Sequence, residues 1–289
     1  MHLSLGLAQI SPRLGLFPEN LQLHLERIHQ ARDAGADLVI FPELSLTGYI
    51  LQDLVSDLAI NPAHSMQLQP LLDECREIDC IFGFVEESDN FKYYNSAAYV
   101  SKGKIQHIHR KLYLPTYGMF DEMRFFAMGE KLRTVKTEFG PLGLLICEDL
   151  WHPSTLFLYA QDGAWMVVTI SSSPGRGIRG DKSFQTSQGW ESLLKTMSQF
   201  YTVYNIYVNR AGTEDGAYFP GGSMVVDPNG EIVAQSTSSG DDFIFAELDS
   251  AEIRRARLQT PVLRDERLEL TLRELTRIIR QRSNFDENN

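Results

Sequence analysis

The sequence is poor in cysteine, lacks long apolar runs and carries no excess of positive charge, and each absence removes a class of protein. Its three cysteines, Cys75, Cys80 and Cys147, are an odd number and do not suit a disulfide framework. No apolar run approaches the roughly 18–20 residues that a membrane-spanning helix needs. The first ten residues, MHLSLGLAQI, lack the positive start and the small-residue cleavage site of a secretory signal. We therefore expect a reduced, cytoplasmic protein.

The shortage of positive charge bears on the partners of the protein. Among the 289 residues, 27 are Lys or Arg and 38 are Asp or Glu, so the formal net charge is −11. Nucleic acids and anionic membranes attract clustered positive charge, so we expect neither as a partner. Apolar residues make up 43% and charged residues 22%, which is typical of a globular chain with a sizeable core.

Short apolar runs alternate with amphipathic stretches along most of the chain. The DPNG segment at residues 227–230 is typical of a hairpin turn, and Gly35 follows an amphipathic stretch where a helix would be capped. No Pro-rich linker, low-complexity tract or repeat interrupts the pattern, so we predict one domain over residues 1–262, of the α+β (α/β layered) class. The predicted strands are residues 3–10, 37–41, 81–85, 96–100, 105–110, 143–146, 165–170, 206–209, 223–226, 232–235 and 243–248, and the predicted helices are residues 19–34, 68–78, 152–161 and 189–204.

Residues 263–289 differ from the rest and predict a C-terminal helix and tail. Leu268, Leu272, Leu275 and Ile279 stand at positions i, i+4, i+7 and i+11, which places them on one helical face, with Arg and Glu elsewhere. Such a face needs an apolar partner. Either this helix packs on its own domain or it packs on another subunit, and the sequence leaves both open.

Three reactive side chains each follow a short apolar run, and the first is Glu43 in FPELSLTGY, residues 41–49. Pro42 stiffens the turn before it. Catalytic groups tend to lie on loops that rigid strands position. A carboxylate held there loses part of its hydration, which would raise its pKa toward that of a general base. A solvated loop glutamate is the alternative.

The second side chain is Lys111 in HRKLYLP, and the third is Cys147 in LLICEDLW. An ammonium fixed in an aromatic loop can stabilise an oxyanion, whereas the alternative for Lys111 is a solvated surface lysine. A cysteine between a buried strand and a helix start can have a lowered pKa and act as a nucleophile. A buried apolar thiol is the alternative for Cys147, and Glu148 and Asp149 would oppose a thiolate if they pointed at the sulfur.

Together the three positions supply a nucleophile, a base and an oxyanion stabiliser, as covalent amide hydrolysis requires. On these residues the sequence resembles the nitrilase superfamily, also called the carbon–nitrogen hydrolases. The family's Glu–Lys–Cys triad is matched by Glu43, Lys111 and Cys147, and the YFPGGS segment at residues 218–223 extends the match across nearly the whole chain. The family's second glutamate, in its F-x-E pattern, is matched by Glu122.

The resemblance implies a four-layer α-β-β-α sandwich, and subunits that pair through helices into a homodimer or higher homo-oligomer. It implies that Cys147, deprotonated with help from Glu43, attacks the carbonyl carbon of the substrate. Lys111 and the backbone N–H of Glu148 would then hold the oxyanion, and Glu122 would position Lys111 or the substrate. Water activated by Glu43 hydrolyses the thioester, and no metal or organic cofactor is implied.

The substrate implied is a small linear carboxamide or carbamoyl compound that releases ammonia or an amine. The segments TYGMFDE and CEDLW look most like the glutaminase domain of glutamine-dependent NAD synthetases and their free-standing relatives. The sequence contains no SGG-type pyrophosphate loop, so we expect no NAD synthesis by this chain alone, and a glutaminase that passes ammonia to a separate synthetase is the second hypothesis. Nitrile hydrolysis is a further alternative, although nitrile hydrolases of the family typically carry Cys-Trp-Glu where this chain has Cys-Glu-Asp. We also expect Tyr49, Tyr117 and Ser172 to contribute to substrate binding.

Gly175, Gly177 and Gly180 have the G-x-G-x-x-G spacing of a dinucleotide fingerprint and follow a predicted strand. The segment SSSP separates that strand from the glycines, and no clean helix begins at the third glycine. We therefore favour a flexible loop near the active site over a nucleotide site.

His107 and His109 form an H-x-H pair, which on a strand points both rings to one face. A metal site needs further ligands, and no other histidine stands at ligand spacing, so we favour a solvated strand face. Cys75 and Cys80 lie five residues apart across a predicted helix–strand junction, and we predict that both are core thiols.

Overall fold

Two six-stranded sheets lie face to face in the computed structural model, which describes residues 1–178 and 184–286. The first sheet contains, in spatial order, β14 (Asp242–Asp249), β1 (His2–Gln9), β2 (Leu38–Ile40), β3 (Asp79–Glu87), β4 (Tyr93–Ser101) and β5 (Lys104–Arg110). The second contains β13 (Ile232–Gln235), β12 (Met224–Val226), β9 (Tyr204–Asn209), β8 (Met166–Ser171), β7 (Gly140–Ile146) and β6 (Val135–Thr137).

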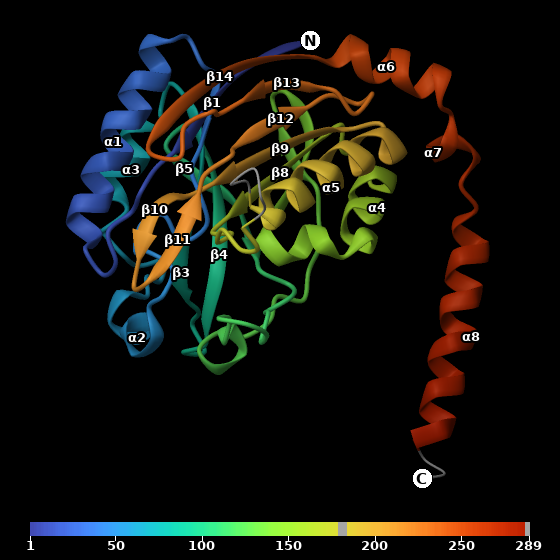
Figure 1. The fold of residues 1–289 in the computed structure, drawn as a ribbon, viewed down its shortest axis with the longest axis horizontal. Helices are drawn as coiled ribbons and strands as arrows, with labels where there is room; N and C mark the ends of the chain where they lie inside the picture. Colours follow the sequence, from blue (N-terminus) through green and yellow to red (C-terminus); the bar gives the residue numbers. More distant parts are fainter. Residues whose placement is uncertain (179–183, 287–289) are drawn as a thin grey trace.

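Helices cover the outer face of each sheet. On the first sheet these are α1 (Phe17–Asp33) and α3 (Gln69–Glu74), and on the second they are α4 (Pro153–Gln161) and α5 (Gln185–Tyr201) (Figure 1). The four-layer α-β-β-α sandwich expected from the sequence is confirmed. In each sheet three neighbouring strands are parallel, β1-β2-β3 and β7-β8-β9, so their carboxyl ends lie at one edge, where loops can gather reactive groups.

The apolar runs of the strands are continuous because both faces of each sheet are covered. In β1, Leu3, Leu5 and Leu7 belong to the core between the sheets. Ala8 and the following Ile10 instead belong to the core between the first sheet and α1 and α3. This alternation fixes the register of β1, because a slip of one residue would exchange the two faces.

Most predicted elements are confirmed within a few residues, and the differences have local causes. Helix α1 ends before Gly35, whose φ of +77° suits the C-cap position predicted for it. The helix predicted over residues 189–204 is displaced, because Thr202 adopts a left-handed conformation and ends α5 at Tyr201. The hairpin of β10 (Ala211–Glu214) and β11 (Ala217–Pro220) was not predicted, although its Asp-Gly turn at residues 215–216 is a hairpin signal.

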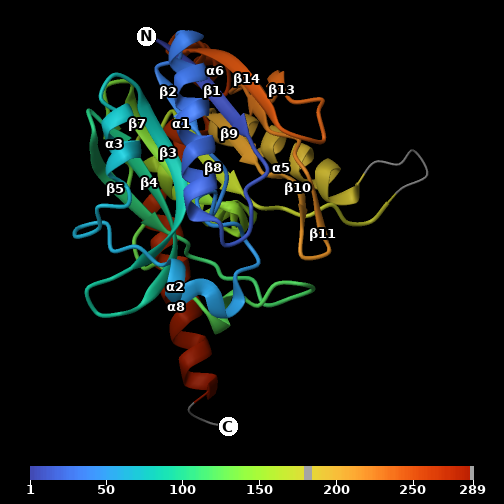
Figure 2. The same ribbon diagram turned by 90° about the vertical axis from the view of Figure 1, so that its left-hand side faces the viewer.

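The C-terminal region consists of α6 (Ser250–Gln259), α7 (Val262–Asp265) and α8 (Leu268–Asp286). Helix α8 extends away from the sheets (Figures 1 and 2). Its apolar face is exposed as a result, with Leu272 68% and Ile279 62% accessible to solvent. Among the described residues, no helix is long and apolar enough to cross a membrane.

Candidate active site

Glu43, Lys111 and Cys147 meet where three strands end. Glu43 follows β2 after two residues, Lys111 directly follows β5, and Cys147 directly follows β7. The Lys111 Nζ lies 2.7 Å from Glu43 Oε1, and the charges of both groups act on the Cys147 thiol. None of the three is a solvated surface group, because their exposed fractions are 0% for Glu43, 1% for Lys111 and 7% for Cys147.

The backbone is strained at Cys147 and directly after Glu43. Cys147 has a φ of +45° and Leu44, next to Glu43, has a φ of +47°, a left-handed conformation that residues with a side chain rarely adopt. The turn at Glu43 also needs Gly83 of β3, because a Cβ on Gly83 would lie 2.3 Å from the Leu44 nitrogen and 2.7 Å from the Pro42 oxygen. The surrounding sheets hold these conformations and thereby aim the two side chains.

Both carboxylate oxygens of Glu43 are held by donors. Oε1 accepts hydrogen bonds from Lys111 Nζ at 2.7 Å and from Asn95 Nδ2 at 2.8 Å, and Oε2 accepts one from the Ser172 backbone N–H at 2.7 Å. The Ser172 hydroxyl also donates to the Glu43 carbonyl at 3.0 Å. Ser172 therefore lies against Glu43 and is not among the residues that line the adjacent cavities.

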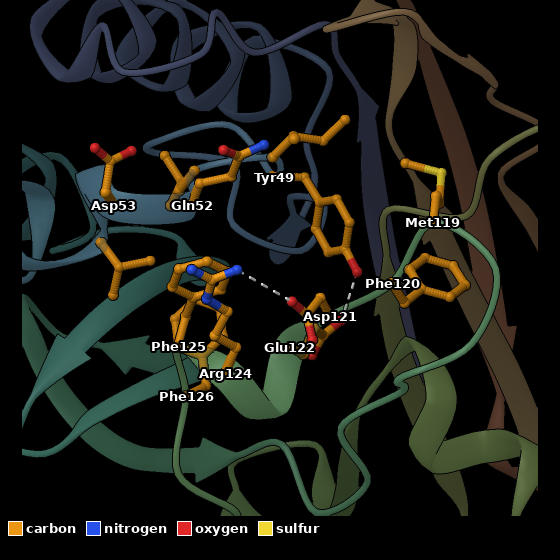
Figure 3. Close-up of a pocket in the computed structure, with 13 residues that line it drawn as sticks. Tyr49, Gln52, Asp53, Met119, Phe120, Asp121, Glu122, Arg124, Phe125 and Phe126 are labelled. Carbon is orange, nitrogen blue, oxygen red and sulfur yellow. Dashed lines mark hydrogen bonds and ion pairs between the residues drawn. The ribbon is translucent and has the colours of Figure 1, made fainter.

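Lys111 is shared between two carboxylates. Its ammonium also donates to Glu122 Oε1 at 2.6 Å. The Tyr49 hydroxyl donates to the same oxygen at 2.5 Å, as Figure 3 shows. Burial alone would lower the pKa of Lys111, but Glu122 and Glu43 raise it well above its ordinary value. Burial raises the pKa of Glu122 to about 7, even though Lys111 acts in the opposite direction. The two carboxylates thus favour the charged form of Lys111, while the pKa of Glu122 lies near neutral pH.

The surroundings of Cys147 favour the neutral thiol over the thiolate. Its Sγ accepts a hydrogen bond from the Ser171 hydroxyl at 3.3 Å. Burial and then the charge of Glu43 raise the pKa of the Cys147 thiol, and the opposing effect of Lys111 is smaller. Burial and the Glu43 carboxylate therefore act against the lowered pKa that a helix start can give to a cysteine. The carboxylate of Glu148, which follows the cysteine, accepts a hydrogen bond from the Tyr117 hydroxyl at 2.8 Å.

Asp149 joins the segments that carry the lysine and the cysteine. Its side chain is fully buried in the 3₁₀ turn at Cys147–Trp151. Oδ1 accepts from the backbone N–H groups of Leu112 and Tyr113 at 2.9 and 3.0 Å. Oδ2 accepts from the Ile146 N–H at 3.0 Å and lies 2.9 Å from His109 Nε2. One carboxylate therefore fixes the residues that flank both reactive groups.

A cavity of about 420 Å³ opens beside Cys147. Glu148 and Arg176 bring opposite charges to its lining, and the Arg176 guanidinium lies 4.6 Å from the ring centroid of Phe120. The Arg176 Nη2 is buried and has no hydrogen-bond partner among the described residues. The remaining lining residues are Tyr117, Trp151, Ser173, Pro174, Gly177, Gln185, Thr186, Gly189 and Trp190.

The residues expected to bind substrate fall in different places. Tyr117 lines the cavity beside Cys147, whereas Tyr49 lines a second cavity together with Glu122 (Figure 3). Sequence reasoning missed Asn95, Asp149 and Arg176, for different reasons. Asn95 lies inside a strand without a motif, Asp149 was considered only as an acidic neighbour of the cysteine, and Arg176 was treated as part of a glycine-rich loop.

The histidine pair, the glycine pattern and the two remaining cysteines noted in the sequence have different outcomes in the structure. The solvated face predicted for the H-x-H pair was wrong for His109, which is buried against Asp149. No group of three potential metal ligands was found in the part of the chain that the structure describes. The glycine pattern is described only in part: Gly177 lines the cavity beside Cys147, while Gly180 lies outside the described residues. Cys75 and Cys80 are buried free thiols, as predicted.

The chain is similar to known proteins over most of its length. A family model described as carbon–nitrogen hydrolase matches residues 4–258. A glutamine-dependent NAD(+) synthetase of Thermotoga maritima is 34% identical over 266 residues, covering 90% of this chain and 44% of the relative. The structure of such a synthetase from Acinetobacter baumannii, in complex with ADP, aligns at 32% identity with a TM-score of 0.78 over 88% of this chain and 47% of that one.

Solved structures of similar length also align. Nit3 of Saccharomyces cerevisiae, a nitrilase superfamily member, is 27% identical and has a TM-score of 0.79, covering 90% of this chain and 95% of its own. By contrast, the chain spans about half the length of the curated relatives that it matches. The strand-end constellation, the sandwich and the family match agree, and this chain belongs to the carbon–nitrogen hydrolases of the nitrilase superfamily.

Proposed function

We propose that the chain is an amidase that hydrolyses the C–N bond of a small linear carboxamide or carbamoyl compound through a thioester on Cys147. The observation that carries this proposal is the buried Glu43–Lys111 pair beside a cysteine that lines an open cavity. Such a pair supplies both a proton acceptor and a fixed positive charge where an acyl-transfer transition state develops its negative charge.

In the proposed reaction, Glu43 takes the proton from the Cys147 Sγ as the sulfur attacks the carbonyl carbon. The carbonyl oxygen becomes an oxyanion, and Lys111 Nζ and the backbone N–H of Glu148 stabilise it. Collapse of this intermediate breaks the C–N bond, and the nitrogen leaves as ammonia or an amine with the proton that Glu43 returns. Glu43 then accepts a proton from water, whose oxygen attacks the thioester and releases the acid and the Cys147 thiol. Glu122 keeps Lys111 in place throughout.

The lining of the cavity supports a substrate that carries two opposite charges. The Glu148 carboxylate suits an amino group, and the buried Arg176 Nη2, which lacks a partner among the described residues, suits a carboxylate. An amino acid with a side-chain carboxamide, such as glutamine, has both groups. The curated relatives are glutamine-dependent by name, which agrees with this substrate class. Cys-Glu-Asp at the nucleophile favours an amide over a nitrile.

A second candidate function is a glutaminase that delivers ammonia to a separate synthetase. It is favoured by one observation, that the chain covers 44% of the Thermotoga maritima synthetase and 47% of the Acinetobacter baumannii one. The two functions differ in their dependence on a partner. The amidase turns over alone, whereas the glutaminase subunit is slow until a synthetase is added.

Ammonia release from a panel of compounds tests the proposal. The panel contains glutamine, asparagine, short aliphatic amides, N-carbamoyl amino acids and nitriles, and Cys147→Ala is compared with wild type. We expect amides to release ammonia and Cys147→Ala to abolish this release, while Cys75→Ala, which removes a thiol outside the cavity lining, retains it. Release by Cys147→Ala would contradict the proposal. Release only from nitriles would contradict the substrate class.

Arg176→Gln tests the carboxylate contact. Loss of a charge-assisted hydrogen bond in a partly buried site should raise KM for an amino-acid amide about tenfold or more and change an uncharged aliphatic amide little. Arg133→Gln, at an exposed arginine outside the cavity, is the matched control. Equal effects of Arg176→Gln on both kinds of amide would contradict the contact.

We also propose that the chain acts in the cytoplasm as a homo-oligomer. The exposed apolar face of α8 supports association, since Leu268, Leu272, Leu275 and Ile279 have no cover in the single chain. Light scattering after size-exclusion chromatography measures the mass directly. A monomeric mass at micromolar concentration would contradict the proposal of an oligomer.

A further inference from the structure

Ser171 is the last residue of β8 and contacts the sulfur of Cys147. Ile146 of β7 pairs with Ile170 of β8, so Cys147 and Ser171 are the next residues of two parallel, neighbouring strands. The Ser171 hydroxyl donates to the Cys147 Sγ at 3.3 Å, and Ser171 is fully buried. Cys147 lines the cavity described above, whereas Ser171 is not among the lining residues. The hydroxyl therefore reaches the sulfur without occupying the cavity.

Tyr207 of β9 contacts the same hydroxyl. Its Oη donates to the Ser171 Oγ at 3.3 Å. Burial raises the pKa of the Tyr207 hydroxyl well above its ordinary value, so this group keeps its proton and remains a donor. The Tyr207 ring is stacked on Trp190, with the ring centroids 4.5 Å apart and the planes at 28°. Because Tyr207 donates to the Ser171 oxygen, the one proton of Ser171 is left for the sulfur.

The proposed reaction places negative charge on the Cys147 sulfur twice, first when the sulfur attacks the carbonyl carbon and again when the thioester breaks. A hydrogen bond to an ionised acceptor is stronger than one to a neutral acceptor, so a donor on the sulfur stabilises the thiolate more than the thiol. Burial and then Glu43 raise the pKa of the Cys147 thiol, whereas Lys111 and the hydrogen bond from Ser171 lower it. Ser171 thus opposes the two effects that disfavour the thiolate.

We propose that Ser171 is a further catalytic residue, whose hydroxyl stabilises the negative charge of the Cys147 sulfur, and that Tyr207 is its positioning residue. This inference rests on the proposed function, in which Cys147 is the nucleophile. Ser171 keeps its own proton throughout, because the thiol proton goes to Glu43 and returns from it. Since the hydroxyl touches the sulfur and does not line the cavity, it changes the rate of the reaction and leaves substrate affinity unchanged.

Alkylation of Cys147 by iodoacetamide in the full chain tests this role without turnover, and mass spectrometry of the peptide that carries Cys147 gives the rate. We expect Ser171→Ala to slow alkylation about tenfold between roughly pH 7 and 9, because the thiolate loses a charge-assisted hydrogen bond. Thr169→Val is the matched control, since the Thr169 hydroxyl is buried on the same strand and has no hydrogen-bond partner among the described residues. We expect its alkylation rate to equal that of the wild type.

Tyr207→Phe tests the positioning role in a double-mutant cycle. Alone, it should slow alkylation about twofold to fivefold, because Ser171 loses a neutral hydrogen bond. Combined with Ser171→Ala, it should cause no further loss, since Tyr207 acts on the sulfur only through Ser171. A further loss in the double variant would overturn the positioning role, because a general effect on packing adds to that of Ser171→Ala. If Ser171→Ala does not fold, a wild-type alkylation rate in Tyr207→Phe overturns the proposal.

Turnover of the best amide of the panel gives an independent measurement. Ser171→Ala should lower kcat about tenfold and leave KM within about twofold of the wild-type value. The proposal is overturned if Ser171→Ala is alkylated as fast as the wild type, or if Thr169→Val is slowed equally. Its failure is distinguishable from that of the proposed function. Ammonia release that Cys147→Ala abolishes, together with wild-type alkylation of Ser171→Ala, would remove the role of Ser171 and retain the amidase.

Discussion

Replacing Asp149 by asparagine should damage both stability and catalysis, because one buried carboxylate holds the residues next to the reactive lysine and cysteine. The amide has one acceptor oxygen where the carboxylate has two. If its NH₂ takes the place of Oδ1, the N–H groups of Leu112 and Tyr113 lose their acceptor, and if it takes the place of Oδ2, the N–H of Ile146 does. Either orientation leaves at least one buried backbone donor unsatisfied.

The expected loss of stability follows from the number of backbone donors left without an acceptor. One unsatisfied buried donor costs about 1–3 kcal/mol, and loss of the charge weakens the remaining hydrogen bonds, so we expect Asp149→Asn to lower the free energy of unfolding by about 2–4 kcal/mol. Urea unfolding measures this. Asp162→Asn is the matched control, because that exposed carboxylate also accepts a backbone N–H, from Thr134 at 3.1 Å, and we expect a loss below about 1 kcal/mol.

Catalysis gives the second measurement for Asp149→Asn. A shift of the two reactive groups by about 1 Å can cost roughly 100-fold in rate, so we expect kcat for the best amide of the panel to fall at least tenfold with little change in KM. A wild-type unfolding midpoint together with a wild-type kcat would refute the role of Asp149. A lower midpoint with an unchanged kcat would reduce that role to stability alone.

Three more predictions concern the same site. Lys111→Met should lower kcat far more than it raises KM, because an oxyanion contact forms mainly in the transition state, and an effect confined to KM would contradict this. Glu122 has a pKa of about 7 and holds Lys111 when it is ionised, so wild-type kcat should fall as the pH drops below about 7. If Glu122→Gln showed the same fall in kcat at low pH, Glu122 would not be the group that causes it. Gly83→Ala should lower kcat and stability by moving the turn at Leu44, while Gly240→Ala, which meets no atom closer than 3.8 Å, should do neither.

Sequence reasoning reached the fold and the central residues because both leave local signals. Buried strands appear in the sequence as short apolar runs. Reactive residues that directly follow several such runs indicate that the ends of those strands lie close together. Glu43, Lys111 and Cys147 were found in this way, and the structure places the Glu43 and Lys111 side chains in direct contact. Their catalytic roles stay predictions, as does the division of the chain at residue 262.

The remaining parts depend on contacts between distant segments, which periodicity does not reveal. Asn95 donates to Glu43 across 52 positions, and Asp149 holds N–H groups 36 and 37 positions away. His109 was expected on a solvated face, but the loop around Asp149 covers it. The predicted end of α5 was also wrong, because the left-handed residue that ends this helix is Thr202, and only a glycine there would have indicated the helix end in the sequence.

If Cys147 is the nucleophile, as we propose, its raised pKa has a consequence for how the thiolate forms. A buried cluster of two carboxylates, Glu43 and Glu122, and one ammonium, Lys111, carries at most one net negative charge. Loss of the thiol proton to bulk water would add a second negative charge in a region that solvates charge poorly. Transfer of that proton to Glu43 leaves the net charge unchanged. The site therefore favours a thiolate that forms together with attack on a bound substrate, and a helix start that lowers the cysteine pKa in advance is not required.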